Sequence, residues 1–474
     1  MNLPLLETTE YQPVATRPGP AGRRVYIETY GCQMNVADSE LVASILADAG
    51  FQITERAEQA DIILLNTCAV REHAEERVIG RVSQLNGLRA HRPNLTLGIL
   101  GCMAQHLSKT LPDRAPFVDL VMGPDSYRRL PQLLAQSSDD ALLDVRLDRS
   151  ENYSDVHPQR TTGTNAWVTI IRGCDKFCTF CIVPFVRGRE RSVPADEIVR
   201  QVQRIAAEGF KEVTLLGQTV NSYRAGKVDF ADLLRQVSQV EGIERVRFTS
   251  PYPVDFTDRV IDAMAEVGPV CPSLHLPVQS GSDEQLARMK RGYTVDQYRQ
   301  LVYKLRTALP DLALTTDIIT GFCGETDADF RRTCDLMEEI RYDSAFMFKY
   351  SEREGTYAHK KLPDDVPEAV KGERLQHIIA LQEGISRQIN QQQVGRTVEV
   401  LVEGPSKRPA ADGQPRYYGR TPQGKTAIFS QSAASNELVA VRIARVTSHT
   451  LFGDRIDDAV LFKPDNNTLS LKEP

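Results

Sequence analysis

The first part of the chain alternates between two hydrophobic patterns. Short apolar runs such as "RRVYIETYG", "ADIILLNT", "LTLGILG" and "FVDLVMG" predict strands. Between them, segments such as "VADSELVASILADAGF" and "REHAEERVIGRVSQL" repeat apolar residues three and four positions apart, which predicts amphipathic helices. Because a strand is followed by a helix four times in succession, the pattern predicts a parallel sheet with helices on its faces.

A second and longer series of strand–helix units follows a polar, turn-rich stretch. Its six predicted strands are "AWVTIIRG", "EVTLLGQ", "VRFTSPY", "SLHLPVQS", "ALTTDIITGF" and "SAFMFKYS". Helical patterns such as "PADEIVRQVQRIAAEGF" and "DADFRRTCDLMEEI" separate them. Six units predict an incomplete barrel that resembles a (β/α)8 barrel without its last two units. Chemistry in such barrels lies at the carboxyl ends of the strands.

The end of the chain has strands but no helices between them. "TVEVLVE" alternates with period two, and "YYGRT", "TAIFS" and "ELVAVRIARVTS" follow it, which predicts a small all-β module of barrel type. The fold class is therefore α/β with an added β-module. The predicted segments are a tail at 1–22, a parallel-sheet domain at 23–135, a linker at 136–165, the barrel at 166–390, the β-module at 391–460 and a tail at 461–474.

Composition excludes several classes of protein. The 474 residues carry a net charge of −6, so no overall basic field indicates nonspecific coating of nucleic acid. No apolar run reaches the length of a membrane span, and the N-terminal stretch lacks the apolar core of a signal peptide. We therefore expect a cytoplasmic protein without membrane contact. Nine cysteines in a reducing compartment indicate metal ligands or buried thiols rather than disulfides.

Three cysteines lie within eight positions in "RGCDKFCTFCIVP", directly after the first predicted barrel strand. Cys174, Cys178 and Cys181 have the spacing C-x3-C-x2-C. Thiolates are the usual ligands of iron–sulfur clusters, and three of them leave one iron of a [4Fe–4S] cluster open to a small molecule. The alternative is a zinc site with a distant fourth ligand.

Three more cysteines each follow a predicted strand of the first domain. Cys32, Cys68 and Cys102 stand in "YGCQMN", "NTCAVRE" and "GCMAQ". Since the carboxyl ends of parallel strands share one edge of a sheet, we expect these side chains to converge there. The alternative is that they are three unrelated buried thiols, a common fate of cytosolic cysteine.

Together these motifs resemble a known family. The C-x3-C-x2-C motif after the first barrel strand is similar to that of radical S-adenosylmethionine enzymes, and residues 23–460 as a whole resemble the methylthiotransferases. The resemblance implies two [4Fe–4S] clusters, one for each cysteine trio, and a terminal TRAM domain, which is an RNA-binding fold. It also implies two S-adenosylmethionine molecules, one for the radical and one for the methyl group. Cys174, Cys178 and Cys181 are then the catalytic cysteines.

Two further stretches resemble one branch of that family. "LLGQTVNSY" and "LHLPVQSGSD" look like the bacterial tRNA branch, which methylthiolates C2 of N6-isopentenyladenosine at position 37, next to the anticodon. The implied partners are the anticodon loop of tRNA, an unidentified electron donor and an unidentified sulfur source, and we expect a monomer. One alternative is the branch that modifies an aspartate of a ribosomal protein. Another, from a different class, is a non-catalytic iron–sulfur protein that binds RNA.

The resemblance also suggests further site residues. Gly217 and Gln218 stand where the superfamily often has a Gly–Glu pair that holds the methionyl amine. Candidates for other contacts with S-adenosylmethionine are Gln279, Ser280, Gly321 and Glu325, for which ordinary loop packing is the alternative. Candidates for contact with RNA phosphate are Arg187, Arg189 and Arg191 of "RGRERS" and Arg420 of the β-module, for which a solvated charged surface is the alternative. Cys271, Cys323 and Cys334 are expected to be unreactive.

Overall fold

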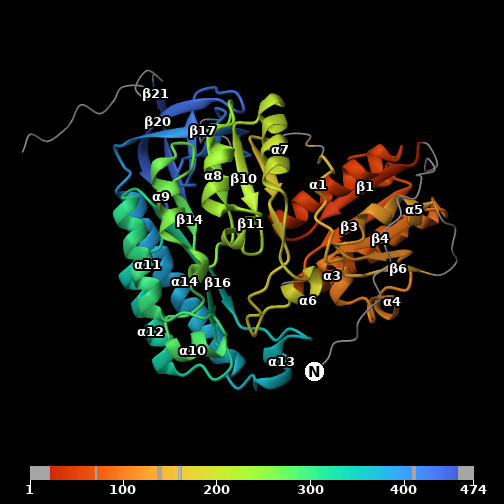
Figure 1. The fold of residues 1–474 in the computed structure, drawn as a ribbon, viewed down its shortest axis with the longest axis horizontal. Helices are drawn as coiled ribbons and strands as arrows, with labels where there is room; N and C mark the ends of the chain where they lie inside the picture. Colours follow the sequence, from red (N-terminus) through yellow and green to blue (C-terminus); the bar gives the residue numbers. More distant parts are fainter. Residues whose placement is uncertain are drawn as a thin grey trace, which may run out of the picture.

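The computed structural model describes residues 22–69, 72–135, 141–158, 160, 163–407 and 413–456 (Figure 1). Within these residues the chain forms the three predicted domains. The predicted tails lie outside the described residues except for Gly22, and the β-module is described as far as Ile456.

The N-terminal domain is a six-stranded parallel sheet with the strand order β2-β1-β3-β4-β5-β6. Its strands are β1 (Arg24–Thr29), β2 (Gln52–Ile53), β3 (Ile62–Thr67), β4 (Thr96–Gly101), β5 (Leu120–Met122) and β6 (Leu142–Asp144). Its helices are α1 (Gln33–Asp48), α2 (Glu72–Asn86), α3 (Cys102–His106), α4 (Leu111–Arg114) and α5 (Leu130–Leu134). Short 3-10 turns lie at Ala57–Gln59, Gly87–Ala90 and Tyr127–Arg129.

Strand β3 shows why helices cover both faces of this sheet. All six of its residues are buried, as expected of a continuous apolar run in a parallel sheet. Ile63 and Leu65 pack into one hydrophobic core, whereas Ile62 and Leu64 pack into another on the opposite face. Because successive side chains point to opposite faces, one strand supplies two cores.

The sequence analysis did not detect the two outer strands of this sheet. Strand β6 lies inside the stretch 136–165 that was predicted to be a linker, and it pairs in parallel with β5. That stretch is therefore partly structural, while its residues 136–140, 159 and 161–162 lie outside the described residues. Strands of two or three residues are too short to show a hydrophobic period.

The central domain is the predicted partial barrel of six parallel strands. They form two three-stranded sheets, β13-β10-β7 and β14-β15-β16, with a bridge between Val246 and Val270 where the sheets meet. The strands are β7 (Asn165–Thr169), β10 (Glu212–Leu216), β13 (Arg245–Phe248), β14 (Ser273–His275), β15 (Ala313–Thr320) and β16 (Ser344–Lys349). The helices are α6 (Val183–Arg187), α7 (Ala195–Ala207), α8 (Phe230–Ser238), α9 (Asp258–Glu266), α10 (Asp283–Arg288), α11 (Val295–Ala308), α12 (Asp327–Ile340), α13 (Tyr357–Lys361) and α14 (Glu368–Gln391).

Local sequence signals fix several helix starts in this barrel. At α11, the Thr294 side chain accepts from the backbone of Gln297, and the Gln297 side chain accepts in return. Thr326 and Asp329 form the same capping box at α12. Such reciprocal caps satisfy backbone donors that a helix start would otherwise leave unpaired.

Two short antiparallel strand pairs lie outside the six barrel strands of the central domain. β11 (Arg224–Ala225) pairs with β12 (Val228–Asp229), and 3-10 turns lie at Val220–Ser222 and Pro253–Asp255. β8 (Ile171–Arg172) pairs antiparallel with β9 (Arg191–Ser192). The β8–β9 pair closes the loop that carries the second cysteine trio, so this loop is anchored at both ends.

The C-terminal domain is a closed barrel with the strand order β17-β18-β19-β21-β20. Its strands are β17 (Thr397–Pro405), β18 (Tyr417–Arg420), β19 (Thr426–Ser430), β20 (Leu438–Val446) and β21 (Thr450–Ile456). The sequence analysis found the first four of these and missed β21. This barrel lies at the amino ends of the central strands: Lys425 Nζ is 2.5 Å from Asp343 Oδ1, one residue before β16. Figure 1 shows it in blue, at the end of the central domain opposite α6 and α13.

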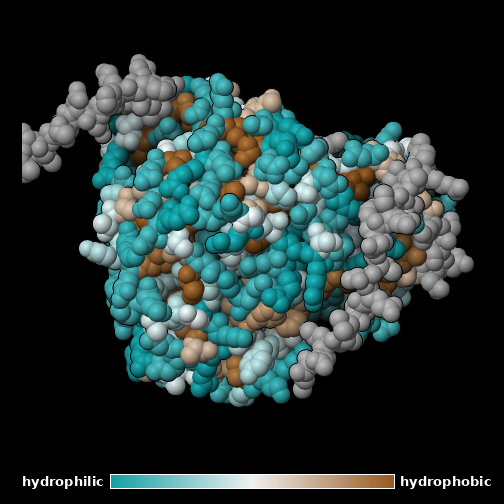
Figure 2. All heavy atoms as spheres, viewed as in Figure 1, coloured by the Kyte–Doolittle hydropathy of each residue, from teal (hydrophilic) through white to brown (hydrophobic). Residues whose placement is uncertain are grey.

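Hydrophilic residues dominate the face of the molecule in Figure 2, with apolar residues scattered among them. Within the described part of the chain, no helix has the length and apolar character needed to cross a membrane.

Candidate functional site

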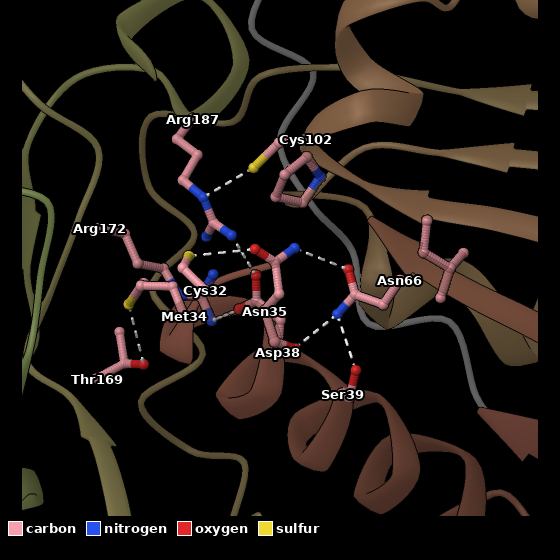
Figure 3. Close-up of polar contacts among 12 residues, drawn as sticks. Cys32, Met34, Asn35, Asp38, Ser39, Asn66, Cys102, Thr169, Arg172 and Arg187 are labelled. Atoms are coloured by element: carbon pink, nitrogen blue, oxygen red, sulfur yellow. Dashed lines mark hydrogen bonds and ion pairs between the residues drawn. The ribbon is translucent and has the colours of Figure 1, made fainter. Parts of the chain in front are cut away.

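Cys32, Cys68 and Cys102 come together at the carboxyl edge of the N-terminal sheet, as predicted. They follow β1, β3 and β4, which are adjacent in the sheet. Cys32 is exposed, Cys68 is half-buried and Cys102 is buried. Figure 3 shows Cys32 and Cys102 on the same side of Asn35, with Arg187 between them.

Two glycines allow the cysteine-bearing loops to cross closely. Gly31 has a φ of +137°, and a Cβ there would lie 2.6 Å from Cβ of Cys68. Gly101 has a φ of +91°, and a Cβ there would lie 2.4 Å from Oδ1 of Asn66. Any larger residue would therefore push the loops apart. Each glycine thus allows the cysteine that follows it to lie close to the neighbouring loop.

A pair of buried asparagines ties these loops together. The Asn66 amide donates to the carbonyl oxygen of Asn35 at 2.8 Å, and the Asn35 amide donates to the carbonyl oxygen of Thr67 at 3.1 Å. Thr67 in turn donates to the carbonyl oxygen of Leu100 at 2.7 Å. The asparagine bonds link the start of helix α1 to β3, and the Thr67 bond links β3 to β4, at the level of the cysteines. Figure 3 shows Asn35 and Asn66 facing each other.

The first trio contains thiols of unequal acidity. A hydrogen bond from the Cys68 side chain and the positive charge of Arg187 lower the pKa of Cys32 to about 6. Enclosure of the sulfur opposes this, although the residue as a whole is exposed. Burial raises the pKa of Cys102, although Arg187 opposes that rise. The trio thus includes one ready thiolate beside a guanidinium, the setting in which cysteine is a good metal ligand.

The second trio lies in the loop between β8 and α6, at the carboxyl end of β7. The Sγ of Cys174 is 3.2 Å from Oγ1 of Thr219, and Nη1 of Arg291 donates to Sγ of Cys178 at 3.3 Å. Burial raises the pKa of Cys174, and it raises that of Cys181 to about 12. Cys174 and Cys181 would therefore release their protons as a metal group binds, because binding requires the thiolate.

Aromatic residues flank the second trio. Phe180 packs edge-on against Phe322, which in turn packs against Tyr350. Phe177 adopts a left-handed φ of +48° and packs edge-on against Phe185. A bulky residue is uncommon in the left-handed region of φ/ψ space, so the backbone turn between Cys174 and Cys178 is tightly constrained. Phe322 and Tyr350 are buried and can keep water from a metal group, whereas Phe177 and Phe185 are exposed.

Each trio is a set of sulfur donors, which is the donor type of iron–sulfur clusters. Within the described residues, no three His, Cys, Asp or Glu side chains gather closely enough to share one ion. In a [4Fe–4S] cluster each cysteine binds a different iron, so its ligands surround the group instead of meeting at a point. Two separate all-sulfur trios match that requirement.

Gln218 presents a free hydrogen-bond acceptor beside the second trio. Its Oε1 is buried, and it has no hydrogen-bond partner among the described residues. Gly217 precedes it, and a Cβ at Gly217 would lie 2.3 Å from Cγ2 of Ile171, so close packing requires glycine there. A buried acceptor without a partner is costly unless a ligand supplies the donor. This agrees with the predicted contact to a methionyl amine.

Three other predicted cofactor contacts are engaged within the protein. Glu325 Oε2 accepts from the backbone N–H of Gly321 at 2.6 Å and pairs with Arg374 at 2.8 Å. A Cβ at Gly321 would lie 2.3 Å from Cγ of Lys371, and Ser280 Oγ accepts from the backbone N–H of Ser282 at 3.2 Å. These contacts favour loop packing, the alternative considered for these residues.

Gln279 stays a candidate for cofactor binding. It is buried, it has a left-handed φ of +74°, and its backbone bridges to Ile318 on β15. A non-glycine residue held in that conformation stores strain, which is common at ligand sites.

Two of the four predicted RNA contacts are buried in ion pairs, so their side chains do not face solvent in this structure. Arg187 pairs with Asp38 and Arg191 with Asp125, each at 2.8 Å. Arg189 is different: its side chain is 59% exposed and pairs with Asp175. Arg420 is also open to solvent, with a side chain 51% exposed. Of the four predicted residues, Arg189 and Arg420 are the two with side chains open to solvent.

Sequence reasoning missed several residues of this site. Arg291 and Thr219 contact the second trio, and Asp38 anchors Arg187 beside the first. Thr219 was detectable because it directly follows Gln218, whereas no spacing signal singles out Arg291 or Asp38. The three remaining cysteines agree with expectation, since burial raises the pKa of Cys271, Cys323 and Cys334.

Comparison with protein families matches all three domains. Residues 24–123 match "Uncharacterized protein family UPF0004", residues 168–337 match the Radical SAM superfamily, and residues 391–456 match the TRAM domain. The first two matches each contain one complete cysteine trio.

Curated relatives align along nearly the whole chain. A protein of Porphyromonas gingivalis named tRNA-2-methylthio-N(6)-dimethylallyladenosine synthase is 47% identical over 446 residues, which cover 92% of this chain and 95% of that protein. Proteins with the same name from Bacteroides thetaiotaomicron and Chloroherpeton thalassium are each 45% identical, covering 92% and 91% of this chain and 96% of each relative.

Among solved structures, the radical S-adenosylmethionine methyltransferase TsrM of Kitasatospora setae has a similar fold. One of its structures superposes with a TM-score of 0.53 and 12% identity, covering 69% of this chain and 75% of that chain. At this level of identity the likeness concerns the fold alone.

Proposed function

Because this chain belongs to the tRNA-2-methylthio-N(6)-dimethylallyladenosine synthases, a family of radical S-adenosylmethionine enzymes, we propose that it methylthiolates C2 of N6-isopentenyladenosine beside the anticodon of tRNA. The observation that carries this proposal is the 47% identity to a relative of that name across 92% of the chain. Both cysteine trios lie within the aligned families.

The two trios would hold two [4Fe–4S] clusters. Cys174, Cys178 and Cys181 would bind the cluster of the barrel, and Cys32, Cys68 and Cys102 that of the N-terminal sheet. Bound to S-adenosylmethionine, the barrel cluster supplies the one-electron chemistry that cleaves the sulfonium and so makes a radical available. A radical is needed because the hydrogen on C2 of adenine is not acidic enough for an ordinary general base to remove.

The residues around the barrel trio orient the cofactors and exclude water. Thr219 and Arg291 contact the sulfurs of Cys174 and Cys178. Such contacts are a main influence of the protein on cluster properties. Gln218 Oε1 would accept a hydrogen bond from the methionyl amine, which would satisfy its buried acceptor.

A short helix connects the two sulfur sites. Helix α6 begins two residues after Cys181, and its last residue, Arg187, contacts Cys102. Five helical residues span only about 7.5 Å along the helix axis. One substrate base at the barrel mouth would therefore be within reach of both sulfur sites.

The C-terminal TRAM barrel would hold the tRNA outside the reaction site. The target base must leave its stack to reach the barrel mouth, at a cost of roughly a few kcal/mol. Contacts to the phosphate backbone would offset that cost. The relatives' names favour tRNA over a ribosomal protein as the substrate, and they name an enzyme rather than a binding protein.

Analysis of tRNA nucleosides in a strain without this gene tests the proposal. We expect the 2-methylthio nucleoside to disappear, to leave N6-isopentenyladenosine in its place, and to return when the gene is restored. If the nucleoside persists while a ribosomal protein loses the mass of a methylthio group, the tRNA assignment is refuted.

A further inference from the structure

Arg187 belongs to the radical core but reaches into the N-terminal cysteine site. From the last position of α6, its Nε donates to Sγ of Cys102 at 3.0 Å, and its Nη2 donates to Oδ2 of Asp38 at 2.8 Å (Figure 3). Cys102 also packs with Ala69, Ile182 and Val186, so both sides of the domain boundary enclose it. One guanidinium thus joins a cysteine and a carboxylate of the other domain.

Five buried charged side chains surround this contact, and among these five the positive charges outnumber the negative ones. Asp38 lies between Arg172 and Arg187, at 2.8 Å from each. Arg191 pairs with Asp125 nearby, and it donates to the backbone oxygen of Arg187 at 3.0 Å. These five side chains are at most 8% exposed.

Three guanidiniums and two carboxylates leave one positive charge in this buried group. Neighbouring Tyr127 and Tyr153 are neutral, since burial raises the pKa of each. A buried charge is costly unless an opposite charge lies close to it. Besides Asp38, Arg187 donates to the sulfur of Cys102, so this positively charged group faces the first trio and favours negative charge there.

We propose that Arg187 is a positioning residue of the N-terminal sulfur site, which fixes the Cys102 sulfur and raises the reduction potential of the cluster bound there. This inference rests on the proposed function, since it requires a cluster at the first trio. Reduction adds negative charge to a cluster, and a hydrogen bond to its sulfur together with a nearby positive charge stabilises that charge. The reduction potential of the cluster in the N-terminal domain therefore depends on docking of the radical core, which supplies Arg187.

Arginine is suited to this task because its donors lie in a rigid planar fork. One edge reaches Cys102 while another reaches Asp38. Lysine keeps the charge but carries a compact ammonium on a flexible chain. Arg187→Lys is therefore expected to retain part of the effect, and Arg187→Gln to lose it.

The test uses the full-length protein with Cys174→Ala, Cys178→Ala and Cys181→Ala, which leaves only the N-terminal trio to bind a cluster. In this background we compare Arg187 with Arg187→Lys and Arg187→Gln after anaerobic reconstitution. The readouts are iron and sulfide content, the midpoint potential of the cluster and the electron paramagnetic resonance spectrum of its reduced form. We expect full cluster content, a more negative potential in Arg187→Gln with an altered spectrum, and an intermediate potential in Arg187→Lys.

Two further variants control for charge and folding. Arg189→Gln removes an exposed guanidinium two positions away and should leave the potential unchanged. Asp38→Asn combined with Arg187→Gln keeps the net charge of the buried group but removes the bond to Cys102, and its potential should still fall.

Identical potentials and spectra for Arg187 and Arg187→Gln would overturn the inference. If Arg187→Gln does not take up iron, the comparison rests on Arg187→Lys. A midpoint potential of Arg187→Lys equal to that of the parent then overturns the inference. The readout needs no tRNA, so a shifted potential in a protein whose intact form fails to methylthiolate tRNA would refute the proposed function but not this inference.

Discussion

Arg245, the first residue of β13, donates from Nη2 to Oε1 of Glu399 in the TRAM barrel at 2.6 Å. Next to it, Arg247 donates to the backbone oxygens of Thr421 and Pro422, each at 2.9 Å. The TRAM barrel is thus attached to the amino ends of the central strands, while Cys174 and its neighbours lie at the carboxyl ends. A strand of five or six residues separates the two ends by about 17–20 Å. A tRNA in contact with both must extend along the side of the central barrel.

Truncation before Gly395 should separate tRNA binding from cluster binding. It removes the TRAM barrel and none of the six cysteines of the two trios, so we expect iron content to stay at two clusters. We expect tRNA affinity to fall by roughly tenfold or more, because phosphate contacts dominate such binding. Unchanged affinity in a filter-binding or fluorescence titration would contradict this role for the TRAM barrel.

The same truncation leaves Arg245 without Glu399, and this loss needs its own control. Glu212 lies 3.9 Å from Arg245, farther than Glu399. Glu399→Gln in the full chain reproduces the loss of that ion pair while the TRAM barrel stays in place. We expect a lower unfolding temperature for Glu399→Gln but unchanged tRNA affinity, which separates docking from binding.

The two trios should have separable roles. Alanine at Cys174, Cys178 and Cys181 should abolish cleavage of S-adenosylmethionine, because the iron that chelates it is lost. Alanine at Cys32, Cys68 and Cys102 should leave cleavage measurable but stop thiolation. Release of 5′-deoxyadenosine under anaerobic reducing conditions measures the first step, and nucleoside analysis measures the second. Equal loss of cleavage in both triple variants would contradict this division.

Glu40 should make the stability of the folded chain depend on pH. Burial raises its pKa from 4.5 to about 7, although Arg160, 3.8 Å away, opposes that rise. Between pH 4.5 and 7 the folded chain therefore binds more protons at this site than the unfolded chain does. The neutral form of Glu40 contributes to the free energy of unfolding at low pH. That contribution, at most about 3 kcal/mol, is lost as the pH rises through this range.

Glu40→Gln should remove that loss. Urea denaturation of the cluster-free protein should show the variant more stable than the parent at pH 8, with little difference at pH 4.5. Glu55→Gln is the matched control, since Glu55 is an exposed glutamate of the same domain. A variant that is no more stable than the parent at pH 8 would contradict the account.

Two kinds of local signal led from the sequence to the cysteines: the spacing of the second trio and, for the first trio, the periodicity of the strands before each cysteine. Strand periodicity located Cys32, Cys68 and Cys102 at strand ends, and a parallel sheet brings such ends together. The arginines could not be read in this way. Arg187, Arg189 and Arg191 stand at alternate positions from the end of α6 to the start of β9. Two of these side chains are buried all the same, because their partners Asp38 and Asp125 are far away in the chain. Burial by distant partners leaves no local pattern, as the contact between Arg291 and Cys178 also shows.

The two exposed candidates, Arg189 and Arg420, should contribute to tRNA binding through phosphate. Arg189 lies in the loop after the barrel trio, and Arg420 lies on the TRAM barrel, so the two sample opposite ends of the expected RNA path. We expect Arg189→Ala and Arg420→Ala each to weaken binding and to reduce the slope of log affinity against log salt by about one. Arg200→Ala is the matched control, because Arg200 is 47% exposed and also pairs with acidic side chains. Its slope should stay at the parent value. If Arg200→Ala reduces the slope as much as the other two variants do, the RNA is held by a diffuse field and not by these two side chains.

Arg191→Ala should behave differently again: it leaves Asp125 buried without its guanidinium and should lower the unfolding temperature. Its effect on tRNA binding would then follow the loss of folded protein rather than a change in salt slope.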